Sequence, residues 1–401
     1  MRSKLFICLL MIALGACKSD EVVPKGYLKE LSLSVEPLPD GLVLRWAESF
    51  YFEEGMYDTP DSPKPVSPTQ YEIYVSEQGG KKLTKIAVVN GDMRQFTLRN
   101  QANGKTVYAQ IKAIHPKLAS SSSRVVTTNV GTLGATSLLF PLNTPYIVYG
   151  AWGGSSLVYK GLDGLAVRRS DNTVRTLKST GQMPVLSPDG QYVAFLGTRN
   201  NSTSYSTQVF IEEVDSGKIK LIDTKQAVFT VEWSSDGKKL AYVAHGDELW
   251  IAPVSDGAPS RLSNSLGSLY PDQIDWSPDD SYIVVSQMKT VFSENRSAYN
   301  LVRVPVNGGS PESLLVSDWY DSRPVFSPDG QHLAFVSDRS GYNAVWILTL
   351  KTANLRQLTG GNERLYYQSR LDWRNNSQLT FSADLPTPSP VDVSMKQISL
   401  P

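Results

Sequence analysis

Cysteine is almost absent from this 401-residue sequence, in which only Cys8 and Cys17 occur, both near the N-terminus. The body of the chain therefore has no thiol for a disulfide, and its folded parts must be held together by core burial. Histidine is equally scarce: His115, His245 and His332 are the three in the sequence. Neither a His-Glu-x-x-His run nor a Gly-x-Ser-x-Gly run is present, so we expect no metal site, no cofactor and no catalytic residues.

Excess charge of one sign is also lacking. The sequence has 39 basic and 39 acidic residues and no run rich in Lys or Arg. A nucleic-acid-binding protein needs a basic face, so this composition excludes nucleic acid as a partner and leaves proteins and glycans. Long apolar runs are missing too. The stretch Leu5 to Leu14 has ten residues, whereas a membrane-spanning helix needs about 20.

The first 17 residues have the features of an export signal. Arg2 and Lys4 precede the apolar stretch, which ends in Leu14-Gly15-Ala16-Cys17. This ending resembles the lipobox of bacterial lipoproteins, and the resemblance implies that the thiol of Cys17 carries a diacylglycerol. The alternative is a plain signal peptide with an incidental cysteine.

Residues 18–27 are expected to form a tether. Its first residues, Lys18 to Glu21, resemble the export tag of surface lipoproteins in the Bacteroidetes. We therefore expect a lipid-anchored protein of the bacterial cell envelope, in the outer membrane, facing either the surface or the periplasm.

Residues 28–130 alternate apolar and polar side chains, which is typical of half-buried strands. The predicted strands are 31–35, 42–46, 71–75, 95–98, 107–113 and 125–128. Short strands in about 100 residues indicate a β-sandwich. Trp46 at the end of the second strand, and Tyr108 within the run 103–109, resemble the core tryptophan and the tyrosine corner of fibronectin type III domains. The long insertion 50–68 is expected to pack on the next domain, or else to contact a partner.

Residues 132–401 contain an internal repeat, which predicts a β-propeller. Tight-turn sequences occur at 187–190, 234–237, 277–280 and 327–330, and each is followed by an apolar strand. Degenerate copies of the strand occur near 146 and 378. Six repeats, 43–50 residues apart, indicate six blades. The closing blade is expected to borrow the segment 136–140. The whole chain is therefore expected to be all-β, a sandwich followed by a six-bladed propeller.

The intact repeat Ser327 to Arg339 resembles those of the TolB-type propeller family. That resemblance implies the architecture and an envelope-protein partner. Successive strands of a blade alternate in direction, so the turns between first and second strands should share one face of the propeller. The loops on the opposite face differ from blade to blade.

Alignment of the repeats places a group of aromatic and basic residues on that opposite face, which we call the predicted rim. Its members are Tyr270, Trp319, Tyr320, Arg323, Tyr366, Tyr367 and Arg370. Tyrosine and tryptophan suit stacking on sugars or gripping a peptide. Alternatively these aromatic side chains pack between neighbouring blades, as we expect for Trp233, Trp276 and Trp373.

Three carboxylates occupy equivalent positions two residues before the turn serine and are expected to line the central channel. They are Glu232, Asp275 and Asp372. Such a set could bind a cation or a basic peptide end, or it could be a solvated channel lining.

These patterns favour a membrane-anchored, non-catalytic binding or scaffolding lipoprotein whose propeller face engages an envelope protein or a glycan. The first alternative is a glycan-capturing component of a nutrient-uptake system. The second is a glycan-active enzyme that uses a pair of carboxylates.

Overall fold

The computed structural model describes residues 26–28, 31–47, 51–53, 67–77, 80, 82–116, 118–139, 149–161, 163–198, 207–224, 226–245, 247–263, 266–267, 269–291, 296–365, 369–384 and 393–400. Every regular element in these ranges is a β-strand, so the expected all-β class is confirmed. The described ranges contain no helix of the length and apolarity needed to cross a membrane. The export signal, Cys17 and most of the insertion 50–68 lie outside the described residues.

Two sheets near the N-terminus form a unit that we call the N-terminal sheet pair. The first sheet has the order β2 (Leu33–Leu38), β3 (Gly41–Trp46), β7 (Gln95–Leu98). The second has the order β10 (Val126–Asn129), β8 (Thr106–His115), β5 (Gln70–Ser76), β6 (Thr84–Asn90), with β9 (Leu118–Ser122) also paired to β8. The short strands β1 (Gly26–Leu28) and β4 (Tyr51–Glu53) pair with each other.

One hydrophobic core joins the two sheets of this pair. The ring of Trp46 in β3 lies 5.4 Å from that of Tyr71 in β5, and both residues are buried. The expected core position of Trp46 is thus confirmed. The sequence analysis missed β6, whose Ile86 and Val88 are exposed.

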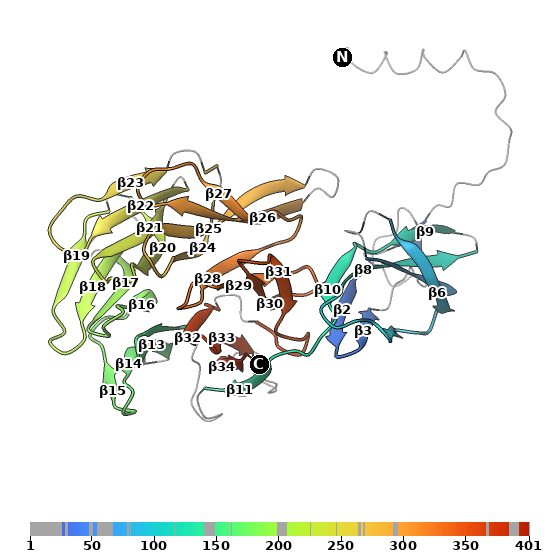
Figure 1. Ribbon diagram of the computed structural model, residues 1–401, viewed down its shortest axis with the longest axis horizontal. Coiled ribbons are helices and arrows are strands. Elements are labelled where there is room, and N and C mark those ends of the chain that lie inside the picture. Colours follow the sequence, from blue (N-terminus) through green and yellow to red (C-terminus); the bar gives the residue numbers. More distant parts are fainter. Residues whose placement is uncertain are drawn as a thin grey trace, which may run out of the picture.

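Six four-stranded sheets follow (Figure 1). The first two contain β12 (Tyr149–Gly153), β13 (Ser156–Gly161), β14 (Gly164–Arg168), β15 (Val174–Thr176), and β16 (Gln182–Leu186), β17 (Tyr192–Thr198), β18 (Thr207–Glu213), β19 (Ile219–Ile222). The next two contain β20 (Val228–Trp233), β21 (Lys239–Ala244), β22 (Glu248–Pro253), β23 (Ser260–Ser263), and β24 (Leu269–Trp276), β25 (Tyr282–Val291), β26 (Arg296–Pro305), β27 (Glu312–Leu315). The last two contain β28 (Ser322–Phe326), β29 (His332–Ser337), β30 (Ala344–Thr349), β31 (Asn354–Gln357), and β32 (Asp372–Asn375), β33 (Gln378–Asp384), β34 (Val393–Ser399), β11 (Ala135–Leu138).

The repeated turn sequences join the first and second strands of their sheets, as predicted. In the turn 327–330 the Ser327 hydroxyl donates to Asp329 at 2.6 Å and accepts the His332 N–H at 2.9 Å. The fourth turn residue has positive φ, which glycine tolerates best. Asp280 takes this place in one turn, with φ 56°.

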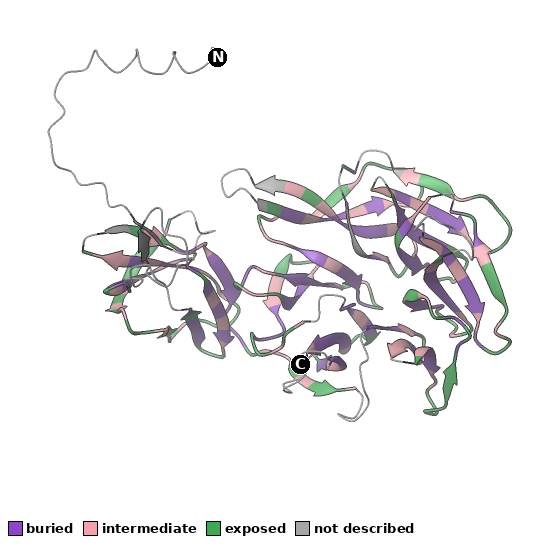
Figure 2. Cartoon of the chain, turned by 180° about the vertical axis from the view of Figure 1, so that it is seen from behind, coloured by how far each residue is buried: buried purple, intermediate pink, exposed green. Residues whose placement is uncertain are grey.

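Three tryptophans connect neighbouring sheets by hydrogen bonds. The indole N–H groups of Trp233, Trp276 and Trp373 donate to backbone carbonyls of the preceding sheet. All three residues are buried, so their expected packing between blades is confirmed. Figure 2 shows the same pattern at the scale of the fold: the inner strands are buried, whereas outer strands such as β15 are exposed.

The last sheet draws its outermost strand from the beginning of this region. β11 pairs with β34, with Thr136 opposite Ile398, which confirms the borrowed strand. The innermost strands contact one another in chain order from β12 to β32, and β32 contacts β12. The six sheets therefore follow one another around a common centre.

The N-terminal sheet pair docks on the fifth of these sheets, with β10 beside β31 (Figure 1). Most contacts come from the loop 338–342. The Val35 N–H donates to the Ser340 carbonyl at 2.8 Å, and the Thr127 N–H donates to that of Arg339 at 2.6 Å. Gly341 makes this approach possible, because its φ is 88° and an added Cβ would stand 2.0 Å from the Leu33 carbonyl oxygen.

We therefore expect Gly341→Ala to loosen this docking, with a larger radius of gyration in small-angle X-ray scattering. Gly267→Ala is the matched control, because Gly267 has a φ of 63° but nothing within 4 Å of an added Cβ. That control should bear only the backbone strain, about 1 kcal/mol, and keep its shape. Equal scattering curves for the two variants would contradict the assigned contact.

Candidate functional site

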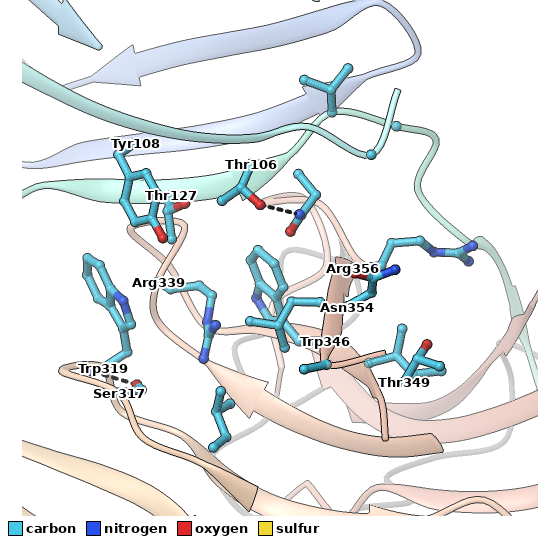
Figure 3. Close-up of a pocket in the computed structure, with 18 of the residues that line it drawn as sticks. Thr106, Tyr108, Thr127, Ser317, Trp319, Arg339, Trp346, Thr349, Asn354 and Arg356 are labelled. Atoms are coloured by element: carbon cyan, nitrogen blue, oxygen red, sulfur yellow. Dashed lines mark hydrogen bonds between the residues drawn. The ribbon is translucent and has the colours of Figure 1, made fainter. Parts of the chain in front are cut away.

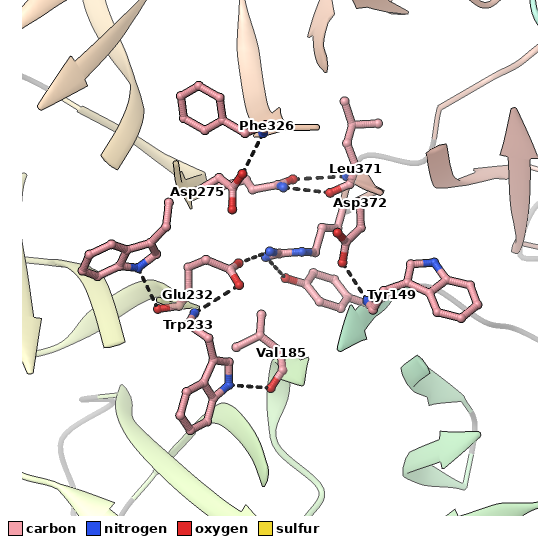
Figure 4. Close-up of polar contacts among 12 residues, drawn as sticks. Tyr149, Val185, Glu232, Trp233, Asp275, Phe326, Leu371 and Asp372 are labelled. Carbon is pink, nitrogen blue, oxygen red and sulfur yellow. Dashed lines mark hydrogen bonds and ion pairs between the residues drawn. The ribbon is translucent and has the colours of Figure 1, made fainter. Parts of the chain in front are cut away.

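The innermost strands bring four charged side chains together at the centre of the six sheets, and we call these residues the central cluster: Glu232, Asp275, Arg370 and Asp372 (Figure 4). The Arg370 guanidinium forms an ion pair with Glu232 and donates to the Tyr149 hydroxyl at 3.2 Å. Arg370 and Glu232 are both buried. This contact links the third sheet to the first and last sheets.

The two aspartates join neighbouring sheets in the same way. Asp275 accepts the backbone N–H of Phe326, and Asp372 accepts that of Trp152, both at 2.7 Å. The amide side chain of Gln273 bridges to both backbone groups of Leu371. Each contact spans two sheets, so the cluster fastens the centre of the fold.

Both aspartates are half-buried, and their carboxylates are poorly hydrated. Loss of hydration raises the pKa of Asp372 to about 6, against the opposing attraction of Arg370. Desolvation also raises the pKa of Asp275 well above its ordinary range, and repulsion from Asp372 adds to this effect. A carboxylate that is held in a poorly hydrated place favours its neutral form.

Most polar groups of the central cluster thus have a hydrogen-bond or ion-pair partner within the protein. The described residues contain no group of three or more metal-ligating side chains suited to a metal ion. In the described part of the chain, the arrangement fits an internal fastening better than it fits an open ligand site.

The predicted rim is only partly assembled. Arg370 is not on an exposed rim, because it is buried against Glu232; the alignment with Arg323 gave its position along the chain but not its partner across the centre. Arg323 is partly exposed and has φ 55°. Tyr366, Tyr367 and the side chain of Tyr270 lie outside the described residues.

The remaining two residues of the predicted rim lie at the join with the N-terminal sheet pair. The ring of Tyr320 packs edge-on against Tyr299 at 4.6 Å. The guanidinium of Arg124 lies over the ring of Trp319, 4.1 Å from its centroid, and also pairs with Asp338 at 3.0 Å. Trp319 therefore faces the N-terminal sheet pair.

Trp319 lines a cleft of about 1180 Å³ between the N-terminal sheet pair and the fourth and fifth four-stranded sheets (Figure 3). We call it the interdomain cleft. Tyr108 and Trp319 stand at one end, and Arg356 stands at the other. Val316, with 65% of its surface exposed, also lines it.

Sequence analysis missed this cleft and its residues Arg356 and Val316, because its walls come from segments that meet only when the two parts dock. Tyr108 had been assigned only to the sandwich. The loop 337–342 was a usable signal, because its sequence differs from those of the equivalent loops in other repeats. In the structure it contacts the N-terminal sheet pair.

The repeated four-stranded sheets, arranged around a common centre, are typical of a β-propeller. Residues 193–383 match the family model of the TolB beta propeller domain, so the chain contains a TolB-like β-propeller domain. It is 26% identical over 155 residues to an uncharacterized protein of Agrobacterium fabrum, covering 38% of this chain and 49% of that protein.

It is also 27% identical over 142 residues to the Tol-Pal system protein TolB of Coxiella burnetii, covering 35% of this chain and 28% of that one. The chain thus spans about half or less of the curated relatives it matches. Among solved structures, a putative TolB from Agrobacterium tumefaciens aligns with a TM-score of 0.47 at 15% identity, over 83% of this chain and 99% of that one.

Proposed function

We propose that this protein is a non-catalytic binding or scaffolding protein of the bacterial cell envelope, and that the interdomain cleft holds its partner, an envelope protein or a glycan. The cleft itself carries the proposal. Residues of the N-terminal sheet pair and of the four-stranded sheets line it together. They include aromatic, apolar and cationic side chains.

Two further observations support a binding role over catalysis. Among the described residues that line the cleft, Asp318 is the one carboxylate, and Lys289 pairs with it at 2.8 Å. Hydrolysis of a glycosidic bond uses two carboxylates about 5–10 Å apart. The similarity to a Tol-Pal system protein supports an envelope setting.

The same proposal includes the organisation of the chain. Residues 1–17 serve as a lipoprotein signal with lipidation at Cys17, 18–27 as a tether to the outer membrane, 28–130 as a fibronectin type III-like sandwich, and 132–401 as a six-bladed propeller. The contacts from β12 round to β32 and back support six blades, and the two packed sheets support the sandwich. A lipid anchor would hold the cleft close to other envelope components.

A pull-down from the native envelope tests the proposal. The full chain serves as bait, either unchanged or as Val316→Glu, which puts a charge on an exposed apolar position of the cleft. We expect Val316→Glu to lose a protein or glycan partner that the unchanged chain retains. Val174→Glu is the matched control, because Val174 is also exposed (53%) but lies on β15, outside the cleft.

Partners recovered equally by both variants would place binding elsewhere on the protein. Near-identical melting temperatures would show that the two substitutions leave the fold intact.

A further inference from the structure

One basic residue of the interdomain cleft differs from the others in having no counter-charge. Lys289 pairs with Asp318, and Arg339 pairs with Asp321 at 2.7 Å. The backbone of Arg356 pairs with Ile347 in β30, but its side chain has no ion pair and no hydrogen bond to the described residues. Its side chain therefore presents a guanidinium that the described part of the protein leaves unmatched.

The side chain of Arg356 is partly buried, which makes its unmatched charge unfavourable. Its Nε is buried and has no hydrogen-bond partner among the described residues. Burial also lowers the pKa of Arg356, although a guanidinium stays charged in proteins. An unsatisfied buried donor destabilises the protein, and more so when it is charged. A bound oxyanion would relieve that cost, because it matches the planar fork of arginine.

The charge of the cleft points the same way. Of the three basic residues in the described lining, Lys289 and Arg339 are paired with aspartates, so Arg356 leaves one positive charge over. The complete chain is neutral, so this local excess of positive charge is a property of the cleft. It favours an anionic ligand and disfavours a basic one.

The shape of the cleft favours a peptide over a small metabolite or a sugar. Its volume lies above the range of about 300–1,000 Å³ that is typical of small-molecule pockets. Trp319 already has Arg124 over its ring, which leaves less of that ring for stacking on a sugar. Residues of β31, the outer strand of its sheet, line the cleft together with residues of β10, which lies beside it. The edge of a strand suits an extended chain.

We propose that the interdomain cleft binds an extended peptide segment of another envelope protein, with a carboxylate of that segment on Arg356 and an apolar side chain near Val316 and Trp319. This inference rests on the proposed function and adds the chemical class of the ligand. The carboxylate belongs to an acidic side chain or to a C-terminus, because both present the same planar pair of oxygens.

Matched fluorescent hexapeptides provide the test. The panel contains apolar and neutral residues with one Glu, together with twins in which Gln replaces that Glu and the C-terminus is amidated. A second set carries a free C-terminal carboxylate with Gln. Fluorescence anisotropy with the full chain should show at least tenfold tighter binding of peptides with a carboxylate, since a charge-assisted hydrogen bond is worth about that factor or more.

Three variants locate the effect. Arg356→Met should abolish the preference for the carboxylate. Arg356→Lys should keep part of it, because lysine retains the charge but not the fork. Arg374→Met is the matched control and should keep all of it, because Arg374 is an exposed arginine on β32 that does not line the cleft.

The proposal is overturned if no peptide of the panel shows a carboxylate preference at millimolar concentration, or if Arg356→Met retains that preference. It is also overturned if polygalacturonate binds through Arg356 while no peptide does, since the ligand would then be an acidic glycan. The pull-down distinguishes failure of this inference from failure of the proposed function. A partner that is lost with Val316→Glu but kept with Arg356→Met preserves the proposed function and removes this inference.

Discussion

Replacing Arg370 with methionine should lower the free energy of unfolding by roughly 3–5 kcal/mol, which is the range for removing one partner of a buried ion pair. Only 3% of the Arg370 side chain and 10% of the Glu232 side chain are exposed. In Arg370→Met the Glu232 carboxylate would stay in this poorly hydrated place without its counter-charge. The Tyr149 hydroxyl would also lose a donor.

Thermal unfolding measures this effect, with an expected fall in Tm of several degrees or more. The double variant Arg370→Met/Glu232→Leu should recover most of the loss, because it removes the uncompensated charge. Arg303→Met is the control, since its pair with Glu312 is exposed and such pairs contribute about 0–1 kcal/mol. If Arg370→Met and Arg303→Met unfold at the same temperature, the central cluster does not fasten the sheets.

The second large effect is a loss of stability as the pH rises from about 4 towards 7. The pKa of Asp372 is raised to about 6 and that of Asp275 is raised well above its ordinary range, both chiefly by desolvation. A raised pKa means that the folded state binds the proton more tightly than the unfolded state does. This stabilisation is complete below the ordinary aspartate value of about 3.9 and is lost as the pH passes through the folded value.

Asp275→Asn should therefore flatten this part of the stability profile and raise Tm at pH 7.5. The asparagine oxygen can still accept the Phe326 N–H, while the repulsion with Asp372 disappears. Tm measured from pH 4 to 8 gives the readout.

Asp279→Asn supplies a contrast of opposite sign. Hydrogen bonds from Ser277 and Ser281 lower the pKa of Asp279, so its contribution is present above about pH 4 and is lost in acid. That variant should lose stability at neutral pH and change little below pH 3. A profile for Asp275→Asn that runs parallel to the wild type would refute the assignment.

Local sequence signals predicted much of the fold. The turn at 327–330 depends on a serine, an aspartate and a glycine that act within six residues of one another, so its structure is visible in the sequence. The indole of Trp276 needs only a neighbouring sheet to reach a carbonyl. The borrowed strand β11 followed from the need to cover a sheet edge.

The candidate site depends on contacts that no local signal encodes. Arg370 and Arg323 occupy equivalent positions in their repeats, and the partner of Arg370 is a carboxylate from across the centre, on Glu232. Trp319 was predicted to face the channel mouth, but docking of the N-terminal sheet pair places Arg124 over it. Repeat alignment gives the positions of these side chains within a sheet and says nothing of the partner that arrives from elsewhere in the chain.

The pairing of β11 with β34 also sets the order in which the protein can become complete. Synthesis proceeds from the N-terminus, so β11 is made well before its partner Val393–Ser399. Until Val393–Ser399 has been made, β11 lacks the strand with which it pairs. Pairings between such distant parts of a chain are slow to form, so we expect the sixth sheet to be completed late in folding.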